Sequence, residues 1–214
     1  MKNAVRARAG RPVVFTADER RAIILASAEA LFVERGYAAT SMADIAQHAG
    51  MSKRTLYEIF TDKETIFSSV VNFCESVPSL LPPGSEQSAE TVLINALVEM
   101  TGFLLGQHQV SRARLAVAEA RGLPDLALAF FDATYNAVIS RMTELLDLLA
   151  ERGDIQVADR KMAADLLVGA MVGDKLVRFL TFPDQASDFH LDAIFRRAEV
   201  SVAVTAQGLG LKRC

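Results

Sequence analysis

The stretch that decides the fold is TSMADIAQHAGMSKRTLYEIFTDKETIF, which runs from Thr40 to Phe67. Ser41 is followed three residues later by Asp44, a capping-box spacing that predicts the start of a helix. Gly50 ends that helix, and Ser52 caps another almost at once. Helices of about two turns are not stable alone in water, so we expect both to pack against a neighbouring helix.

Helical signals also flank this stretch. Thr16 and Glu19 form a capping box that opens a longer helix, and Gly36 ends it. Its apolar side is supplied by Ile23, Ile24, Ala26, Ala28, Leu31 and Phe32. On the other side, Thr61 and Glu64 predict a further box at the start of the next helix. The pattern therefore predicts a first, longer helix followed by three helical segments, of which the two short ones around Gly50 lean on the first.

Two short helices joined by a glycine turn are typical of a helix-turn-helix. A major groove about 12 Å wide admits one helix, and the second helix of the motif here begins with Lys53, Arg54 and Thr55. Tyr57 offers a hydroxyl to a phosphate, and Lys63 stands at the start of the following helix, where phosphates bind readily. The alternative is an ordinary helical core whose cations are simply solvated.

Charge is distributed unevenly along the 214 residues. Residues 1–54 carry nine basic and five acidic side chains, a balance of +4, so the rest sums to −7 within the net charge of −3. A basic head on an acidic body is typical of a polyanion-binding domain attached to a body that does not bind polyanions. Within residues 1–11, we expect Lys2, Arg6, Arg8 and Arg11 to form an arm that follows DNA, although a solvated tail has the same composition.

The residues from Ile24 to Phe67 resemble the DNA-binding domain of TetR-family transcriptional regulators. The resemblance lies in four separated motifs, "LF.E.GY..TS", "DIA..AG.S", "TLY..F" and "KETIF". It implies a homodimeric, ligand-responsive repressor that binds a palindromic operator in double-stranded DNA. It also implies that phosphates are contacted by Ser41, Tyr57 and Lys63, and bases or backbone by Lys53, Arg54 and Thr55.

Beyond the head, apolar positions recur at helical spacing and strand signals are almost absent, so the predicted class is all-α. The Pro/Gly/Ser-rich stretch ESVPSLLPPGSEQS predicts a domain boundary, with a DNA-binding domain at 1–76 and a helical effector-binding and dimerisation domain at 77–214. Helices are expected near 87–107, 110–121, 125–152, 159–181 and 189–208. The stretch from Ser111 to Phe182 resembles the C-terminal domain of AefR-like members of the family.

The last two expected helices are apolar on more than one face, and the resemblance implies that they pair with a second copy as a four-helix bundle. A monomer core would show the same periodicity. An effector pocket for a small, largely apolar molecule is expected among the large side chains of the body, namely Met100, Phe103, Gln107, Phe131, Tyr135 and Met171. Met and Phe at helical spacing are equally typical of core. Asp174 and Arg178 lie inside an apolar run and are spaced to pair with each other.

Other function classes find little support in the sequence. There is no H-E-x-x-H, P-loop, G-x-G-x-x-G or G-x-S-x-G motif, so no enzyme, metal site or cofactor is expected. No apolar run of membrane-spanning length or secretory signal occurs, so a cytoplasmic location is expected. The two functions that remain are a ligand-responsive repressor and a constitutive or architectural DNA-binding protein without an effector.

Overall fold

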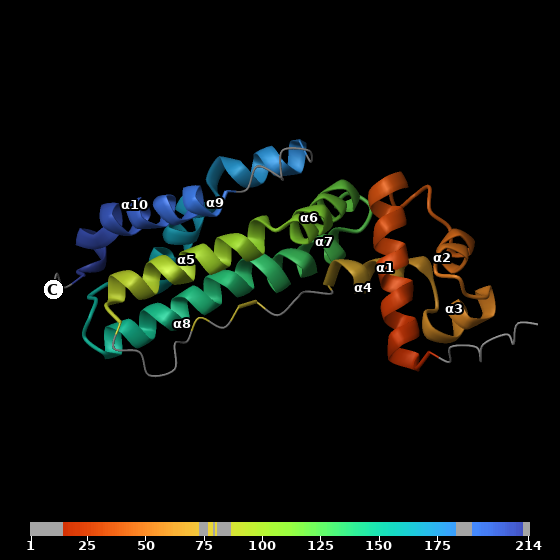
Figure 1. Ribbon diagram of the computed structural model, residues 1–214, viewed down its shortest axis with the longest axis horizontal. Coiled ribbons are helices and arrows are strands. Elements are labelled where there is room, and N and C mark those ends of the chain that lie inside the picture. Colours follow the sequence, from red (N-terminus) through yellow and green to blue (C-terminus); the bar gives the residue numbers. More distant parts are fainter. Residues whose placement is uncertain (1–14, 73–76, 79, 81–86, 183–189, 212–214) are drawn as a thin grey trace, which may run out of the picture. The chain divides into compact units, whose positions relative to one another are not determined.

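The computed structural model describes residues 15–72, 77–78, 80, 87–182 and 190–211 (Figure 1). Every regular element in these ranges is helical, which confirms the all-α class. The chain divides into two compact units, Met1–Phe67 and Ser68–Cys214. That division lies nearer the N-terminus than the domain boundary expected after residue 76. The expected basic arm at 1–11, and most of the Pro/Gly/Ser-rich stretch, lie outside the described residues.

The first unit contains α1 (Ala17–Arg35), α2 (Met42–His48), α3 (Lys53–Ile59) and the start of α4 (Lys63–Asn72). Both predicted capping boxes, Thr16 with Glu19 and Ser41 with Asp44, are present, and the Ser52 side chain caps α3. The box predicted at Thr61 is wrong. The Asp62 carboxylate accepts from the Thr65 amide at 2.7 Å instead, because a carboxylate one residue closer to α4 reaches its free N–H groups.

The core of this unit explains how such short helices persist. Ile24 and Phe32 of α1, Ile45 of α2 and Leu56 of α3 are almost fully buried. The rings of Phe32, Tyr37 and Phe67 form a cluster with centroid separations of 4.7–5.6 Å. Burial of these side chains supplies the stability that helices of seven residues lack on their own.

The second unit is a helical body. Its elements are α5 (Ala89–Leu105), α6 (Gln107–Glu119), α7 (Pro124–Phe131), a π-helical turn η1 (Asp132–Asn136), α8 (Ala137–Glu151), α9 (Arg160–Thr181) and α10 (Leu191–Leu209). Helix α9 packs against α5, α8 and α10, and α5 also packs against α10. The core between them includes Leu93, Leu97, Met142, Leu146 and Leu167. The expected helix 125–152 is in fact α7, η1 and α8 joined end to end.

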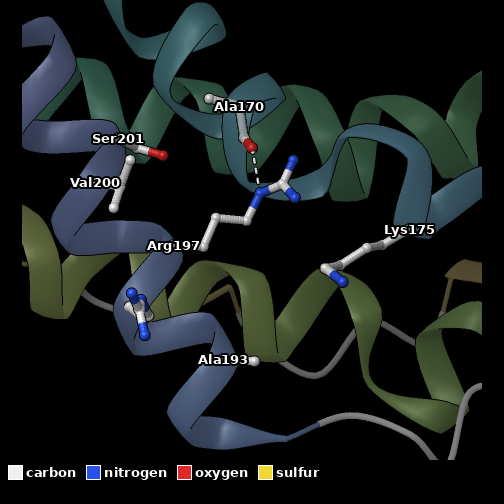
Figure 2. A pocket seen from close by; sticks show the side chains of 7 residues that line it. Ala170, Lys175, Ala193, Arg197, Val200 and Ser201 are labelled. Atoms are coloured by element: carbon white, nitrogen blue, oxygen red, sulfur yellow. Dashed lines mark hydrogen bonds between the residues drawn. The ribbon is translucent and has the colours of Figure 1, made fainter.

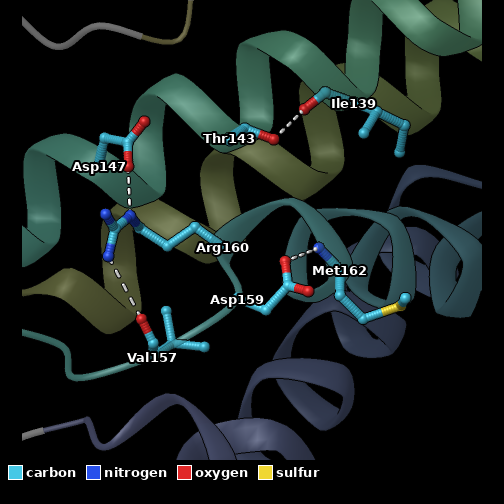
Figure 3. Close-up of polar contacts among 7 residues, drawn as sticks. All are labelled: Ile139, Thr143, Asp147, Val157, Asp159, Arg160 and Met162. Carbon is cyan, nitrogen blue, oxygen red and sulfur yellow. Dashed lines mark hydrogen bonds and ion pairs between the residues drawn. The ribbon is translucent and has the colours of Figure 1, made fainter.

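Polar contacts fix the turn between α8 and α9 (Figure 3). The Asp159 carboxylate accepts from the Met162 amide at 2.9 Å and caps α9. The Arg160 guanidinium bonds the Asp147 carboxylate of α8 and the Val157 carbonyl. These bonds therefore hold the first turn of α9 against α8, at the end where the two helices begin to pack together.

Helix α9 breaks at Gly173, whose φ of 42° and ψ of −132° lie outside helical values. The expected pair of Asp174 with Arg178 is wrong, since in the described residues the ion pair of Asp174 is with Arg197 of α10. No single described helix has the length and apolar character of a membrane span, and α5 with α6 passes that test only as a pair bent by 53°.

Candidate nucleic-acid interface

The turn between α2 and α3 has the hydrogen bonds of a Schellman motif. The Met51 amide donates to the Ala46 carbonyl at 2.9 Å, and the Gly50 amide donates to the Gln47 carbonyl at 3.1 Å. Gly50 occupies the left-handed position of the motif with φ of 65°, which a residue without Cβ adopts at no steric cost. The chain then reverses direction quickly enough for Ser52 to cap α3 two residues later.

Helix α3 has an inner and an outer side. Leu56 and, one turn on, Phe60 are buried in the head, as their spacing predicted. Lys53, Arg54 and Tyr57 are exposed, and the Arg54 side chain is 88% exposed. Arg54 Nε lies 3.0 Å from Glu58 Oε1, an exposed pair that aligns the guanidinium along the helix. The exposed side of α3 therefore presents two cations and a phenol to solvent.

Two of the sequence-predicted contact residues have local structural bonds. The Thr55 amide donates to Ser52 Oγ at 3.1 Å, and the two hydroxyls lie 2.9 Å apart. The Ser41 hydroxyl donates to the Asp44 carboxylate within the capping box of α2. Both hydroxyls lie in the first turn or at the cap of a short helix, where amides and hydroxyls can face a phosphate together.

Lys63 has a role that the sequence reasoning missed. Its ammonium donates to the Tyr37 carbonyl at 2.7 Å and to the Thr40 carbonyl at 2.8 Å, and lies 4.2 Å from the centre of the Tyr37 ring. Two of its three N–H groups thus hold the segment between α1 and α2 against the start of α4. An ammonium has one further N–H group beyond these two. No local signal predicts these bonds, since they join residues more than twenty positions apart.

The capping carboxylates of the head respond to pH. Hydrogen bonds from Ser41 hold the pKa of Asp44 below its ordinary 3.8, and bonds from Thr65 do the same for Asp62. A depressed folded-state pKa stabilises the fold fully above the unfolded value, and that contribution is lost as pH falls through the folded value.

We therefore expect the thermal midpoint of the head to fall as pH drops below about 4. Asp44→Asn should lower the midpoint at pH 7 and make the acid decline shallower, as followed by circular dichroism from pH 7 to pH 3. Asp18→Asn removes the same charge from the exposed first turn of α1 and is the matched control. Identical profiles for the two variants would rule out the capping explanation.

The six residues predicted for an effector pocket do not all come together. Met100 and Met171 are buried in the core of the body, with Phe103 and Tyr135 packed against it. Gln107 is exposed at the start of α6, and Phe131 is 40% exposed on α7. The Tyr135 hydroxyl donates to Asp165 of α9 at 3.2 Å, and burial together with that carboxylate raises the pKa of Tyr135. A hollow in the body, lined from α9 and α10, involves none of the six (Figure 2).

The short-helix head with an exposed cationic helix and the all-helical body together define a helix-turn-helix regulator. Residues 24–70 match the family described as bacterial regulatory proteins, tetR family, and residues 91–204 match the AefR-like transcriptional repressor, C-terminal domain. The chain belongs to the TetR family of transcriptional regulators.

Solved structures of similar proteins agree over most of the chain. A TetR-family transcriptional regulator from Mesorhizobium loti MAFF303099 superposes with a TM-score of 0.77 at 28% identity, covering 91% of this chain and 98% of that one. The flavonoid-responsive regulator FrrA gives a TM-score of 0.73 at 26% identity, covering 89% of this chain and 96% of its own. The likeness therefore extends through both units.

Curated relatives match over a short part of the chain. The transcriptional activator FasR of Mycolicibacterium smegmatis is 44% identical over 54 residues, which is 25% of each chain. The transcriptional repressor ComR of Escherichia coli is 43% identical over 63 residues, or 29% of this chain and 28% of ComR. The match thus spans less than a third of these two relatives, one of which activates and one of which represses.

Proposed function

We propose that this regulator is a homodimeric repressor that binds a roughly palindromic operator and is released from it by a small, largely apolar effector. The observation that carries the proposal is the two-sided helix α3. Leu56 anchors it to the head, while Lys53, Arg54 and Tyr57 are free to enter a major groove. A helix fixed on one side and cationic on the other is what groove recognition requires.

The other proposed DNA contacts are assigned from the positions of the side chains in the head. Ser41 at the cap of α2 and Lys63 at the start of α4 are assigned to phosphates, and Thr55 to a base or the backbone. Tyr57 is assigned to a phosphate through its hydroxyl. Phosphate contacts set the register of the head on the duplex, and the side chains at the start of α3 read base edges.

The proposed dimer face lies on α9 and α10. These helices, together with Phe182 directly after α9, expose large apolar side chains, at Met162, Leu166 and Val177 of α9 and at Leu191, Phe195, Val200 and Val204 of α10. Apolar surface of this extent marks an interaction site on a soluble protein, and a two-fold dimer buries the same patch on both copies. The dimer then offers two α3 helices to half-sites about 34–36 Å apart, which is why the operator should be palindromic.

The body supplies the proposed effector response. Phe103 and Tyr135 are only partly buried beside a core of methionine and leucine side chains, a surrounding that suits an apolar ligand. The structural relative FrrA is described as flavonoid-responsive, which supports a small organic effector for a body of this shape. An effector that binds more tightly to the dimer conformation whose DNA-binding heads do not match the half-site spacing would weaken operator binding by about 1–3 kcal/mol.

The central experiment selects operator DNA from a genomic library with the full-length protein and sequences what is retained. Recovery of a two-fold symmetric site supports the proposal, and recovery of unrelated sequences contradicts it. Small molecules and cell extracts are then screened for release of that site. If none shifts the equilibrium, the chain is a constitutive or architectural DNA-binding protein.

Phe131 tests the effector assignment directly. Because its ring is partly exposed and lies edge-to-face with Phe130 at 5.8 Å, Phe131→Ala should leave the fold and the operator affinity intact. The effector concentration needed for half-release should rise by about threefold to tenfold, because the ligand would bury less apolar surface. Leu128→Ala removes a similar exposed side chain from the same helix and is the control. Equal responses of the two variants would remove Phe131 from the site.

A further inference from the structure

The C-terminal end of α3 is covered by an arginine of α1, which packs against α3 (Figure 1). Arg21 Cζ lies 4.5 Å from the centre of the Phe60 ring. Phe60 directly follows α3, is only 1% exposed, and donates its amide to the Leu56 carbonyl at 2.9 Å. Arg21 itself is exposed. The guanidinium therefore lies at the surface of the head, against an aromatic ring that is fixed in the core.

This contact orders a side chain that would otherwise sample many rotamers. A cation over an aromatic face is attracted by the ring, and the planar guanidinium carries its N–H groups along its edge. Because the Phe60 ring already restricts Arg21, less conformational entropy is lost when the guanidinium binds an anion. An arginine placed in this way is suited to the two parallel hydrogen bonds that a phosphate accepts.

Arg21 and the cations of α3 lie at opposite ends of that helix. Lys53 and Arg54 open α3, whereas Arg21 lies over the residue that ends it. Seven residues at about 1.5 Å each give a separation of roughly 10 Å, which is comparable with the major-groove width of about 12 Å. On the helical wheel, position 60 falls between the buried Leu56 and the exposed Tyr57. Arg21 therefore lies at the edge of the exposed side of α3.

The surroundings of Arg21 offer few carboxylates that would compete with a phosphate. Residues 1–14, which precede α1, contain four cations and no acidic side chain. Asp18, three residues before Arg21, is exposed, and exposed pairs at this spacing are weak. Three other carboxylates near Arg21 or Phe60 in the sequence are engaged in caps or an ion pair, those of Glu19, Glu58 and Asp62.

We propose that Arg21 is a further DNA contact of the head, which binds a phosphate beyond the C-terminal end of α3 while the Phe60 ring holds it in place. The proposal rests on the proposed function, in which α3 enters the major groove. Because phosphates carry no sequence information, Arg21 contributes affinity and register but no base preference. The alternative is a structural role, in which Arg21 only covers Phe60 and stabilises the head.

The experiment measures binding of the full-length protein to operator and scrambled duplexes by fluorescence anisotropy between about 50 and 200 mM salt. Arg21→Gln should lower affinity for both duplexes by about tenfold and reduce the salt slope by about one unit per head, because one phosphate contact is lost from each. Arg121→Gln removes the same charge from an exposed position after α6 and is the matched control, which should bind normally.

Arg21→Lys separates the charge from the shape of the side chain. It keeps a cation that can lie over Phe60 but loses the planar fork, so it should retain the salt slope and lose no more than about threefold in affinity. Urea unfolding of each free protein reports the stability of the head.

The outcomes distinguish the two roles of Arg21. If Arg21→Gln lowers stability but leaves the salt slope unchanged, Arg21 only covers Phe60 and the proposal is overturned. Equal losses of slope in Arg21→Gln and Arg121→Gln would reflect the net charge of the chain and would overturn it as well. Both results leave DNA binding through α3 intact. Failure of the unaltered protein to bind either duplex would instead contradict the proposed function, and this contact with it.

Discussion

Val204→Glu is expected to convert the dimer into monomers and to lower operator affinity by about a hundredfold or more. Val204 is the most exposed of the large apolar side chains on α10, at 77%. In a two-fold dimer each substitution places two new carboxylates on the shared face, and burying an unpaired charge there is costly. Operator affinity falls because two linked heads bind far more tightly than one.

Sedimentation velocity reports the oligomeric state, and a gel-shift titration on the selected operator reports affinity. Leu128→Glu is the control, since it places the same charge on a similarly exposed apolar position of α7, outside the proposed dimer face. That variant should remain dimeric and bind normally. A Val204→Glu protein that stays dimeric, or dissociation of both variants alike, would place the dimer contact elsewhere.

Local signals predicted the head well. Ser41, Ser52 and Gly50 act through bonds to residues within a few positions, so their spacing alone indicates where α2 and α3 begin and end. The error at Thr61 arose because Asp62 offers a second capping group one residue later. Where two capping side chains are adjacent, sequence spacing does not decide between them.

The features that sequence missed depend on distant contacts. The position of the Lys63 ammonium depends on its hydrogen bonds to the Tyr37 and Thr40 carbonyls. At the break in α9, Arg197 of α10 donates to the Ala170 carbonyl, and its side chain lies beside Gly173. The spacing of Gly173 and Arg197 in the sequence does not indicate this contact. Periodicity indicated the apolar positions of the helical body but not their burial. Met100 and Phe131 both lie at apolar positions of helical spacing, yet Met100 is buried and Phe131 is exposed.

The second large effect is expected at the DNA interface, where Lys63→Ala and Arg54→Ala should differ in kind. Lys63→Ala removes two charge-assisted bonds to carbonyls and should destabilise the head by about 1–3 kcal/mol. It should also weaken binding to all DNA about equally, since a phosphate contact carries no sequence information. The salt slope should fall by roughly one unit for each phosphate that the protein no longer neutralises.

Arg54→Ala should leave stability nearly unchanged, because its pair with Glu58 is exposed and such pairs contribute little. If Arg54 reaches a guanine edge, its removal relaxes preference at one position of each half-site by about 1–3 kcal/mol, while non-specific binding falls less. The contrast separates the two roles, since Lys63 supports the head and its placement on DNA while Arg54 reads sequence.

Both variants are measured on operator and scrambled duplexes across a salt series, with urea unfolding of each free protein as the stability readout. The bonds of Lys63 make the unfolding measurement necessary, because a weaker head would lower DNA binding even if Lys63 never met a phosphate. If Lys63→Ala lowers the stability but does not change the salt dependence of DNA affinity, Lys63 acts only through its bonds to the Tyr37 and Thr40 carbonyls. Parallel, sequence-independent losses of affinity for both variants would make Arg54 a phosphate contact, and normal binding by both would exclude α3 from the groove.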